Sequence, residues 1–477
     1  MSANLKGLTF INGVVICWLA LAMAVPLVYD IFLCEGACVK IFVSSIAACI
    51  FWGGLMVLSC ASQQKPTFSQ KDSFLLVISL WCVISIISSL PFYLYSDVRL
   101  SFVASLFESV SGITTTGATI YPDVEILPEA INLWRFILHF IGGIGIVAIG
   151  IVALPAMRLG GMQLFWAENS DNTEKFMPKA SQIAGVFAWI YITMILIFAL
   201  LLKLSGMNIF DSVCHSISSI STGGFSTKNA GISWYKSGVI EFVISGAMFV
   251  GGLAFLELAR CFKGRGNRIF KIQQIRGYFR IISCMIVIPV IAKAIWGEFP
   301  HTFKKISDHI LQVVSAVTTT GYYYSDSDIA PPILFMIVAI IGGCSGSTTG
   351  GIKIFRVQIL YAVVKHWIRK ATSQYNVSIP KYQNQRLTDD LIQSVVTMIV
   401  LFVITFLVSS IALWCATDRS SLTCCYSVLS CLFNLGFEAR FSTYSPVAHL
   451  IFICDMIVGR LEVVPLFVIL SQSFWKR

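Results

Sequence analysis

The chain has few charged residues. Asp, Glu, Lys and Arg make up 12% of its 477 residues and hydrophobic residues make up 56%, whereas a soluble domain is usually about a quarter charged. One core cannot bury this much apolar surface, so the scarcity of charge excludes an ordinary soluble protein and predicts one solvated largely by lipid. No cleavable signal peptide is evident either. The apolar run 8–28 is long enough to span a membrane and lacks a small-residue cleavage site, so we interpret it as the first membrane helix.

The sequence also lacks the spacings that mark catalytic or metal sites. Its 6 histidines are scattered and form no pair at helical spacing, and no Cys/His spacing matches a zinc site. We therefore expect neither an enzyme nor an organic cofactor. The 15 cysteines lie mostly in apolar runs, where they pack as small hydrophobic groups. Cys34 and Cys38, in a predicted external loop, could form a disulfide, although two free thiols are the simpler interpretation.

The net charge of +10 is distributed in a way that argues against nucleic acid as a partner. Lys and Arg cluster in loops between apolar runs, which is typical of the cytoplasmic loops of membrane proteins. The clusters lie at 260–280 and 365–386, with smaller ones at 65–71 and 158–179. We place these loops and both termini in the cytoplasm.

Apolar runs of about 20 residues predict ten membrane spans. The spans are 8–29, 39–60, 73–95, 131–155, 183–204, 238–262, 278–297, 331–367, 390–416 and 447–472. The eighth is too long for one helix and is interrupted by the glycine-rich stretch 342–351. An even number of spans puts both termini on the same side, in agreement with the charge pattern.

Four shorter, semi-apolar segments alternate with the later spans. Each is too short to cross a membrane, and each leads into a turn of small residues with a glycine. The segments are 103–113, 209–220, 303–317 and 420–433, and the turn glycines are Gly117, Gly223, Gly321 and Gly436. The simplest interpretation is a half-membrane helix followed by a loop that returns outward, because non-helical backbone at membrane depth is tolerated only where it lines a watery cavity.

These patterns predict an all-α integral membrane protein with ten transmembrane helices. The last eight form four repeats of helix, pore helix, filter turn and helix around one pseudo-fourfold pore. Two N-terminal helices occupy 1–62, and the repeats occupy 63–160, 161–264, 265–370 and 371–477, the third with a broken second helix. A serine lies six residues before the turn glycine in three repeats, at Ser111, Ser315 and Ser430.

The turns have the chemistry to bind a dehydrated cation. Backbone carbonyls can replace its water ligands, glycine permits the torsion angles that aim carbonyls inward, and Thr and Ser add hydroxyl oxygens. Each pore helix also directs its partially negative C-terminus at its turn. A single turn of this kind could be ordinary loop chemistry, but four at matched positions favour an ion site. The fourth turn, with Asn434 and Leu435, would contribute mainly carbonyls, and Glu438 and Arg440 beside it could form an external ion pair.

The stretch 342–351, followed by Ile352 and Lys353, could be taken for a phosphate-binding loop. That motif needs Lys directly after its second glycine and then Ser or Thr. Ile352 follows Gly351 instead, which argues against nucleotide binding. We expect a flexible loop beneath the filter that can obstruct the pathway; a passive helix kink is the alternative.

Arg460 lies near the middle of the last predicted span, where a cation costs at least about 2.5–3.5 kcal/mol. Glu462 is the nearest acid in sequence, but residues two apart on a helix do not face each other. We expect Arg460 to face the pore below the filter; structural pairing with another group is the alternative.

The four turns, the break from Gly342 to Lys353 and the motif Gly459–Glu462 together resemble the Trk/Ktr/HKT superfamily of potassium transporters. The stretch Gly160–Leu164 and the two additional N-terminal helices resemble the TrkH-type membrane subunits within it. The resemblance covers nearly the whole chain. It departs at Phe437–Arg440, where TrkH-type members usually have a Pro-Gly pair and where this chain is closer to the plant and Ktr-like pattern.

The resemblance implies roles for particular residues. The potassium-binding filter would comprise Thr115, Thr116, Gly117, Ser221, Thr222, Gly223, Thr319, Thr320, Gly321, Asn434, Leu435 and Gly436. The gating loop would comprise Gly342, Gly343, Gly346, Ser347, Thr348, Gly350, Gly351 and Lys353. Arg460 would supply the positive charge of the pore.

The resemblance also implies potassium uptake across a bacterial cytoplasmic (inner) membrane, with potassium as the transported ion. It implies a homodimer in membrane lipid that assembles with a cytoplasmic nucleotide-binding regulatory subunit resembling TrkA, for which the basic loops 260–280 and 365–386 are suited. Sodium or ammonium is the alternative ion. Whether transport is passive or coupled to protons or sodium stays open.

Overall fold

The structure is a computed structural model that describes most of the chain. The described residues are 4–34, 36–60, 69–152, 180–262, 270–296, 302–322, 329–372, 379–383, 385–437 and 441–476. Within them the chain is almost entirely helical, with one two-stranded antiparallel sheet, β1 (Lys381–Tyr382) and β2 (Gln385–Arg386).

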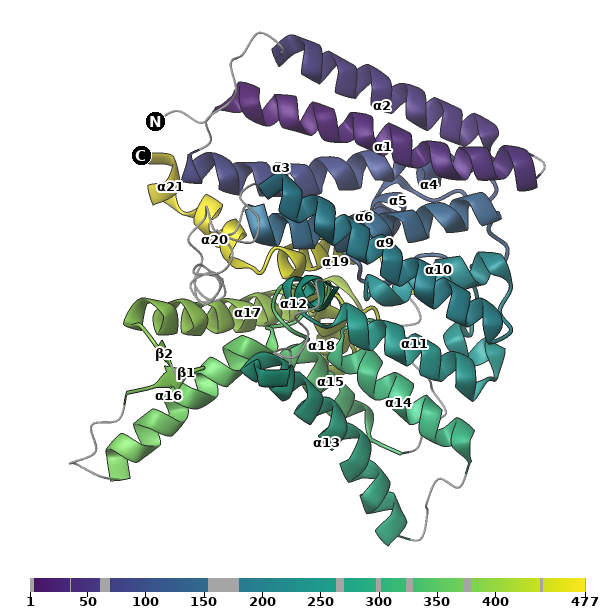
Figure 1. Cartoon of the computed structure of the whole chain (residues 1–477). Helices are drawn as coiled ribbons and strands as arrows, with labels where there is room; N and C mark the ends of the chain where they lie inside the picture. Colours follow the sequence, from purple (N-terminus) through teal and green to yellow (C-terminus); the bar gives the residue numbers. More distant parts are fainter. Residues whose placement is uncertain are drawn as a thin grey trace. The chain divides into compact units, whose positions relative to one another are not determined.

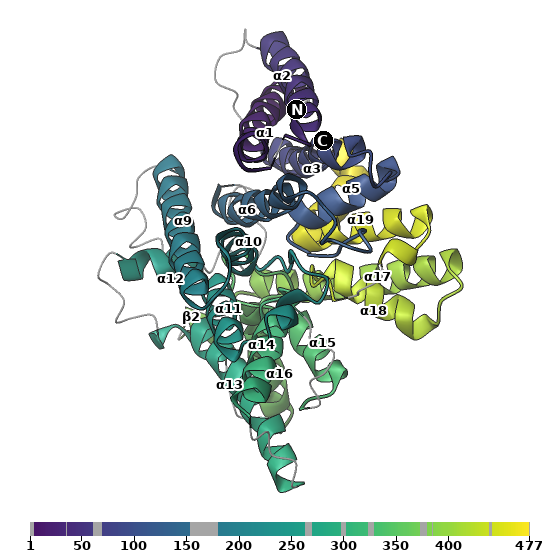
Figure 2. The same ribbon diagram turned by 90° about the vertical axis from the view of Figure 1, so that its right-hand side faces the viewer.

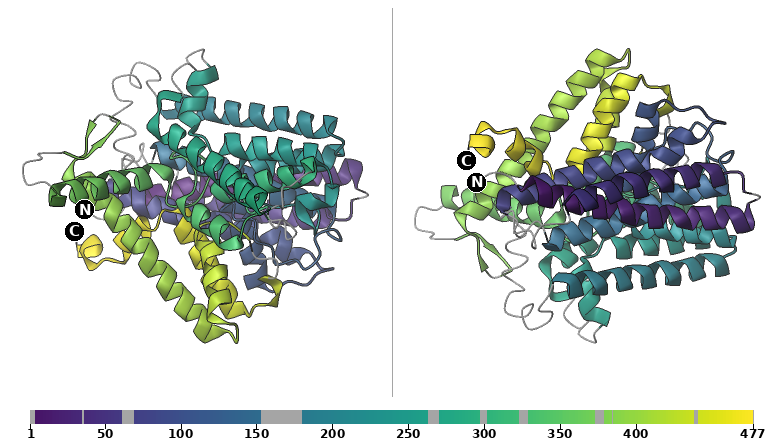
Figure 3. Two further views of the ribbon diagram at one scale, coloured as in Figure 1. Left: turned by 90° about the horizontal axis from the view of Figure 1, so that it is seen from below. Right: turned by 90° about the horizontal axis from the view of Figure 1, so that it is seen from above.

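The described residues cluster into two compact units. Unit 1 comprises Met1–Gly143, Gly223–Trp234 and Phe406–Arg477, and unit 2 comprises Ile144–Thr222 and Tyr235–Thr405. In unit 1, α1 (Leu5–Leu33) and α2 (Val39–Cys60) run side by side (Figures 1 and 3). Gly13 and Gly53 bring them together, because a Cβ on either glycine would lie 2.8–2.9 Å from atoms of the facing helix. Cys34 and Cys38, between these helices, are free thiols.

Six helical segments of the described residues are long and apolar enough to cross a membrane. They are Leu5–Leu33, Val39–Cys60, Gln70–Leu94, Gly185–Leu204, Gln273–Ile295 and Asp389–Ala416. They coincide with six of the ten predicted spans, in agreement with a multi-pass membrane protein. The other four predicted spans are those expected to be the second helices of four repeats.

Three of those second helices are broken. Only α6 (Glu129–Val152) is continuous, while the others divide into α11 (Gly238–Gly251) and α12 (Phe255–Arg260), α15 (Pro332–Ile341) and α16 (Ile354–Thr372), and α19 (Pro446–Arg460) and α20 (Val464–Leu470). The break at 342–353 agrees with the sequence prediction. Continuous helices over 238–262 and 447–472 were wrong expectations.

Local backbone geometry explains the two unpredicted breaks. At the first, Gly252 and Leu253 leave the helix, and the carbonyl of Gly252 accepts a hydrogen bond from the amide of Cys344, 3.1 Å away. At the second, Glu462 and Val463 adopt φ of 60° and 62°. A β-branched residue in this region is rare, so hydrophobicity alone gave no indication of it.

The four short segments are helices at the predicted positions. They are α5 (Phe102–Ile113), α10 (Ile209–Ile220), α14 (Phe303–Val317) and α18 (Ser421–Leu432). Three begin at a side chain that accepts a hydrogen bond from the first turn: Ser101, Asn208 and Ser420. At about 1.5 Å per residue, 12 residues span about 18 Å, roughly half of the bilayer.

The remaining helices hold these short helices within each unit. In unit 1, α3 (Gln70–Ser88), α4 (Leu90–Leu94) and α19 pack on α5, and α18 packs on α19 (Figure 2). In unit 2, α9 (Ala180–Leu204) and α11 pack on α10, while α11, α13 (Gln273–Ile295) and α15 pack on α14. In unit 1, α20 also packs on α3. The remaining elements are α17 (Asp389–Ala416) and the short helices η1 (Gly231–Tyr235), η4 (Phe441–Thr443) and α21 (Gln472–Lys476).

Candidate cation-binding site

Each of the four short helices ends in the same backbone conformation. One non-glycine residue has positive φ, and a glycine two positions later has positive φ as well. The first set is Thr115 (54°), Thr222 (53°), Thr319 (53°) and Asn434 (53°), and the second is Gly117 (79°), Gly224 (81°), Gly321 (92°) and Gly436 (66°). A non-glycine residue held in this region costs about 1–3 kcal/mol and persists only where its surroundings impose it. Because this costly conformation occurs four times, we infer that the fold imposes it at each turn.

The torsion angles correct the register of the second turn. Gly224, rather than Gly223, has the place of Gly117, so the residue that matches Thr115 is Thr222. The amide hydrogen bonds agree, since the residue at φ near 53° donates to the carbonyl three residues earlier in every repeat: Gly112, Ser219, Ala316 and Cys431. Ser218 then joins Ser111, Ser315 and Ser430 six residues before the glycine, so the serine occurs in all four repeats. Two consecutive glycines concealed this register in the sequence.

Ser221 consequently has a different position from the one predicted. It is the C-cap of α10, as Thr114 is of α5 and Thr318 is of α14. All three hydroxyls donate to the carbonyl four residues earlier, at 2.6–2.7 Å. These hydroxyls therefore terminate the helices.

The hydroxyls of Thr116 and Thr320 are also engaged within the protein. Each is 2.7 Å from the hydroxyl of the preceding cap residue, Thr114 or Thr318. In the fourth turn, Asn434 donates from Nδ2 to Thr116 Oγ1 at 2.9 Å and to the carbonyl of Met456 at 3.0 Å. The side chains thus hold the turns to their helices and to one another, and backbone carbonyls are the oxygens common to all four.

In unit 1, parts of three turns lie in direct contact through their glycines. A Cβ on Gly436 would lie 2.2 Å from the carbonyl oxygen of Thr116, and a Cβ on Gly117 would lie 2.2 Å from that of Gly223. No side chain fits at either distance, so only glycine allows the backbones to approach this closely.

A second set of glycines lies beneath the helix ends. A Cβ on Gly142, Gly251 or Gly459 would lie 1.9, 2.6 or 1.8 Å from the last carbonyl of the short helix in the same repeat. Gly142 and Gly459 belong to unit 1, and Gly251 belongs to unit 2. These second helices therefore support the turns through backbone contact.

The loop between α15 and α16, residues 342–353, contacts two turns within unit 2. Thr348 Oγ1 donates to the carbonyls of Ile220 and Gly251, each 3.1 Å away, and accepts from Thr222 Oγ1 at 3.2 Å. The amide of Gly350 donates to Thr319 Oγ1 at 2.7 Å. The loop thus binds the residue at φ near 53° in both the second and the third turn.

Close backbone packing gives this loop its shape. Gly342 and Gly351 have φ of 72° and 78° and lie against each other, since a Cβ on Gly351 would be 2.8 Å from the Cα of Gly342. Lys353 is buried, and its Nζ donates to the carbonyl and the hydroxyl of Thr349. The remaining predicted loop residues Gly343, Ser347 and Gly350 are buried, and Gly346 accepts from the amide of Phe255 at 2.9 Å.

Arg460 is the last residue of α19 and is 3% exposed. It immediately follows Gly459, which contacts the end of α18. Its Nη2 donates to the carbonyl of Gly142 at 3.4 Å, so it links the second helices of the fourth and first repeats inside unit 1. The arginine is therefore buried near the C-terminal end of α18, at the end of a helix rather than near the middle of a continuous one.

The sequence argument missed a buried ion pair in unit 1. Glu108, in α5, and Arg135, in α6, form an ion pair of 2.7 Å with side chains 0% and 1% exposed. Both residues stand within apolar segments, which is the signal that identified Arg460 and could have identified them. Gly160–Leu164, Glu438 and Arg440 lie outside the described residues.

The sequence matches the family model described as "TrkH: Cation transport protein" over residues 39–296 and 299–477. The chain is 32% identical to the Trk system potassium uptake protein TrkI of Halomonas elongata, over 97% of this chain and 96% of that protein. It is 30% identical to the Trk system potassium uptake protein TrkH of Escherichia coli K12, over 87% of this chain and 88% of that protein.

Its fold matches the crystal structure of the potassium transporter TrkH from Vibrio parahaemolyticus with a TM-score of 0.89 and 25% identity, covering 99% of this chain and 100% of that one. The family match covers nearly the whole chain and includes all four turns. The chain therefore belongs to the TrkH family of cation transport proteins, and is a transport protein rather than an enzyme.

Proposed function

We propose that this chain carries potassium into the cell through one filter formed by its four turns. The observation that carries the proposal is the fourfold recurrence of the same two left-handed positions after a short helix, in a chain whose relatives are named as potassium uptake proteins. The filter would comprise the three residues from Thr115, Thr222, Thr319 and Asn434 to the glycine two positions later.

The filter would bind potassium mainly through backbone carbonyls. The hydroxyls of Thr116 and Thr320 already pair with the helix caps, and Gly223 and Leu435 have none at the same position. Carbonyl oxygens supply a cation with ligands that carry no formal charge, and the partially negative C-terminal ends of the short helices favour a cation at the same place.

The loop 342–353 would act as the gate. Its attachment to Thr222 and Thr319 supports this role, because the loop then lies directly against the residues that begin two filter segments. Arg460 would place a positive charge near the inner end of the filter and discourage cations from resting there. A cytoplasmic regulatory subunit resembling TrkA would act on the gate, and two copies of the chain would form the membrane dimer.

A flux assay in reconstituted vesicles tests the proposal. We expect the purified chain to carry potassium and rubidium faster than sodium at equal gradients, and to restore growth at low potassium in cells without their own uptake systems. Equal fluxes of sodium and potassium, with the regulatory partner present, would contradict it. The orientation of the chain in the membrane is tested separately. A membrane-impermeant maleimide is applied to intact cells to label Cys34, with Cys34→Ser as the control.

A further inference from the structure

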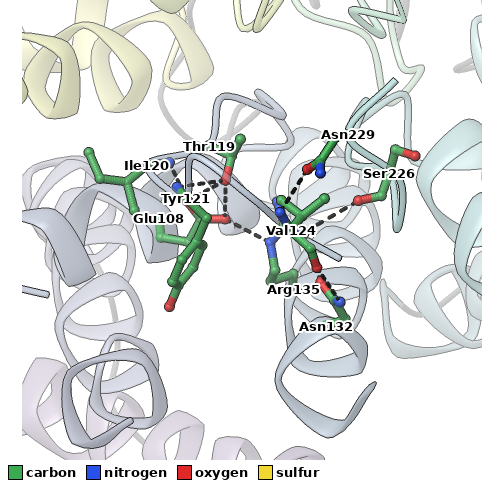
Figure 4. A network of polar contacts seen from close by, with 9 residues as sticks. All are labelled: Glu108, Thr119, Ile120, Tyr121, Val124, Asn132, Arg135, Ser226 and Asn229. Atoms are coloured by element: carbon green, nitrogen blue, oxygen red, sulfur yellow. Dashed lines mark hydrogen bonds and ion pairs between the residues drawn. The ribbon is translucent and has the colours of Figure 1, made fainter. Parts of the chain in front are cut away.

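The ion pair of Glu108 and Arg135 lies immediately outside the first turn (Figure 4). Neither side chain reaches solvent, and both belong to unit 1. A charged pair in such surroundings is stable only if its remaining donors and acceptors are satisfied. The hydrogen-bond partners of these two residues therefore show which segments the ion pair holds in place.

The carboxylate of Glu108 binds the segment that leaves the first turn. Thr119 Oγ1 donates to Oε1 and Oε2 at 3.2 and 3.1 Å, and the amide of Ile120 donates to Oε2 at 2.8 Å (Figure 4). Thr119 and Ile120 follow Gly117 by two and three residues. The pore helix thus fixes its own return segment through one carboxylate.

The guanidinium of Arg135 reaches the segment that leaves the second turn. Its Nη1 donates to Asn132 Oδ1 at 3.0 Å and to the carbonyl of Ser226 at 3.4 Å (Figure 4). Its Cζ lies 4.1 Å from the centre of the Phe225 ring, and that ring stacks on His139 at 4.2 Å. One ion pair therefore joins the outer segments of two adjacent turns, whose backbones touch at Gly117 and Gly223.

The position of Glu108 is polar in every repeat. It lies nine residues before the glycine of its turn, and the equivalent residues in the corrected register are His215, Gln312 and Ser427, all buried. Ser427 Oγ lies 2.8 Å from the hydroxyl of Tyr444, and the ring of His215 packs edge-on against Tyr235 at 5.7 Å. Tyr444 and Tyr235 both follow their turns, so at least three of the four positions contact the return segment of their own repeat.

We propose that Glu108 and Arg135 are positioning residues that set the separation of the first two turns, and with it the discrimination between potassium and a smaller cation. The inference rests on the proposed filter. Carbonyl ligands discriminate between cations according to their number and spacing, and the pair fixes that spacing without touching the ion. Its removal should therefore change the ratio of potassium to sodium flux rather than only the amount of folded protein.

The test compares neutral and conservative variants in vesicles. Removing one charge leaves the other buried and unpaired, which can prevent folding, so the principal variant is the double substitution Glu108→Gln with Arg135→Gln. We expect it to elute as a single species with a wild-type melting temperature. Its potassium-to-sodium flux ratio should be about tenfold lower, because a tenfold change corresponds to about the net free energy of one hydrogen bond.

The variant Arg135→Lys distinguishes the charge pair with Glu108 from the other contacts through which Arg135 positions the second turn. Lysine can keep the charge pair with Glu108 but cannot also reach Ser226 and lie flat on Phe225, because its ammonium is a single point charge. We expect a folded protein with a reduced flux ratio. The matched control is Glu241→Gln with Lys304→Gln, which removes another ion pair. Its Glu241 carboxylate is buried and accepts from Ser307 in the first half of α14, while Lys304 is partly exposed. The flux ratio of this control should equal that of the wild type.

The outcomes separate the two proposals. A selective wild-type chain beside an equally selective, folded double variant overturns the positioning role alone. A wild-type chain that carries no potassium overturns the proposed function, and the positioning role with it. A change of ratio in the Glu241 and Lys304 control as large as that in the double variant shows a general effect of buried charges and also overturns the positioning role.

Discussion

Thr348 in the loop 342–353 and Thr222 in the second turn are joined by a hydrogen bond of 3.2 Å between their side-chain oxygens. Thr222 is one of the four residues held at φ near 53°. The loop is thus attached to a position that all four turns share, and a conservative substitution at Thr348 can test the proposed gate.

Thr348→Val should increase ion flux. Valine keeps the volume and removes the hydroxyl that joins the loop to Thr222, Ile220 and Gly251. Losing one to two net hydrogen bonds of about 1 kcal/mol each favours the displaced loop by about five- to thirtyfold. The measurement is potassium flux in vesicles without the regulatory partner. Thr193→Val, which removes an exposed hydroxyl of α9, should leave flux unchanged, and an equally unchanged Thr348→Val would exclude gating by this contact.

Gly117→Ser should lower ion selectivity. A side chain there meets the carbonyl of Gly223 at 2.2 Å and requires an unfavourable positive φ of 79°, so the two adjacent turns must separate. We expect the potassium-to-sodium flux ratio to fall at least about tenfold. Gly206→Ser is the control, because Gly206 also has positive φ, 104°, but has open space around it. A similar loss in both variants would point to backbone strain alone.

Arg460→Gln should raise potassium flux. Two unit charges at a separation of about 10 Å would interact by about 1.7 kcal/mol at an effective dielectric constant of 20, so an arginine at such a separation from the ion would lower flux by more than about tenfold. Single-channel or vesicle recordings provide the measurement. Arg419→Gln removes an arginine that binds Thr443 near an exposed surface and serves as the control. Wild-type conductance in Arg460→Gln would show that the residue has only a structural role.

Asp123 should make a stabilising contribution that depends on pH. The side chain of Asn229 donates to this carboxylate at 2.7 Å, the amide of Glu125 donates to it at 2.9 Å, and together they lower the pKa of Asp123 below its ordinary value. Because the pKa in the folded state is lower than in the unfolded state, the contribution is present above the unfolded pKa of about 3.9 and is lost as pH falls through the folded value.

The pH prediction can be measured with Asp123→Asn. The melting temperature of the variant should lie below that of the wild type at pH 7, and the difference should disappear as the pH falls below about 4. A difference that stays constant over this range would assign the effect to packing rather than to ionisation. The melting temperature of Glu125→Gln, which neutralises a neighbouring carboxylate, is compared over the same pH range.

The sequence was informative about the short helices because all four end with a local signal and three also begin with one. A capping side chain such as Ser101 starts the helix and a glycine turn follows it, and α5, α10, α14 and α18 lie within two residues of their predicted bounds. The loop after Gly342 was predictable for the same reason, since a run of glycines interrupts an apolar segment.

Features set by tertiary contact were not predictable in this way. The choice between Gly223 and Gly224 depends on which residue has positive φ, and neighbouring glycines are equal in sequence. The break after Arg460 depends on Val463, a residue that ordinarily favours extended or helical backbone. The pairing of Glu108 with Arg135 joins residues 27 apart, so each charge was visible in the sequence but their contact was not.

The middle position of the four turns holds Thr116, Gly223, Thr320 and Leu435. The side chain thus varies from hydroxyethyl to hydrogen to isobutyl, while φ is 53–54° one residue earlier and 66–92° one residue later. The four turns thus share a path of the backbone, whereas the side chain at this position differs with its surroundings: Thr116 accepts from Asn434, and a Cβ on Gly223 would lie 2.4 Å from His139 Nδ1. Substitutions at this position should therefore be tolerated according to the space in each turn, whereas the glycine that follows is required in all four by its positive φ.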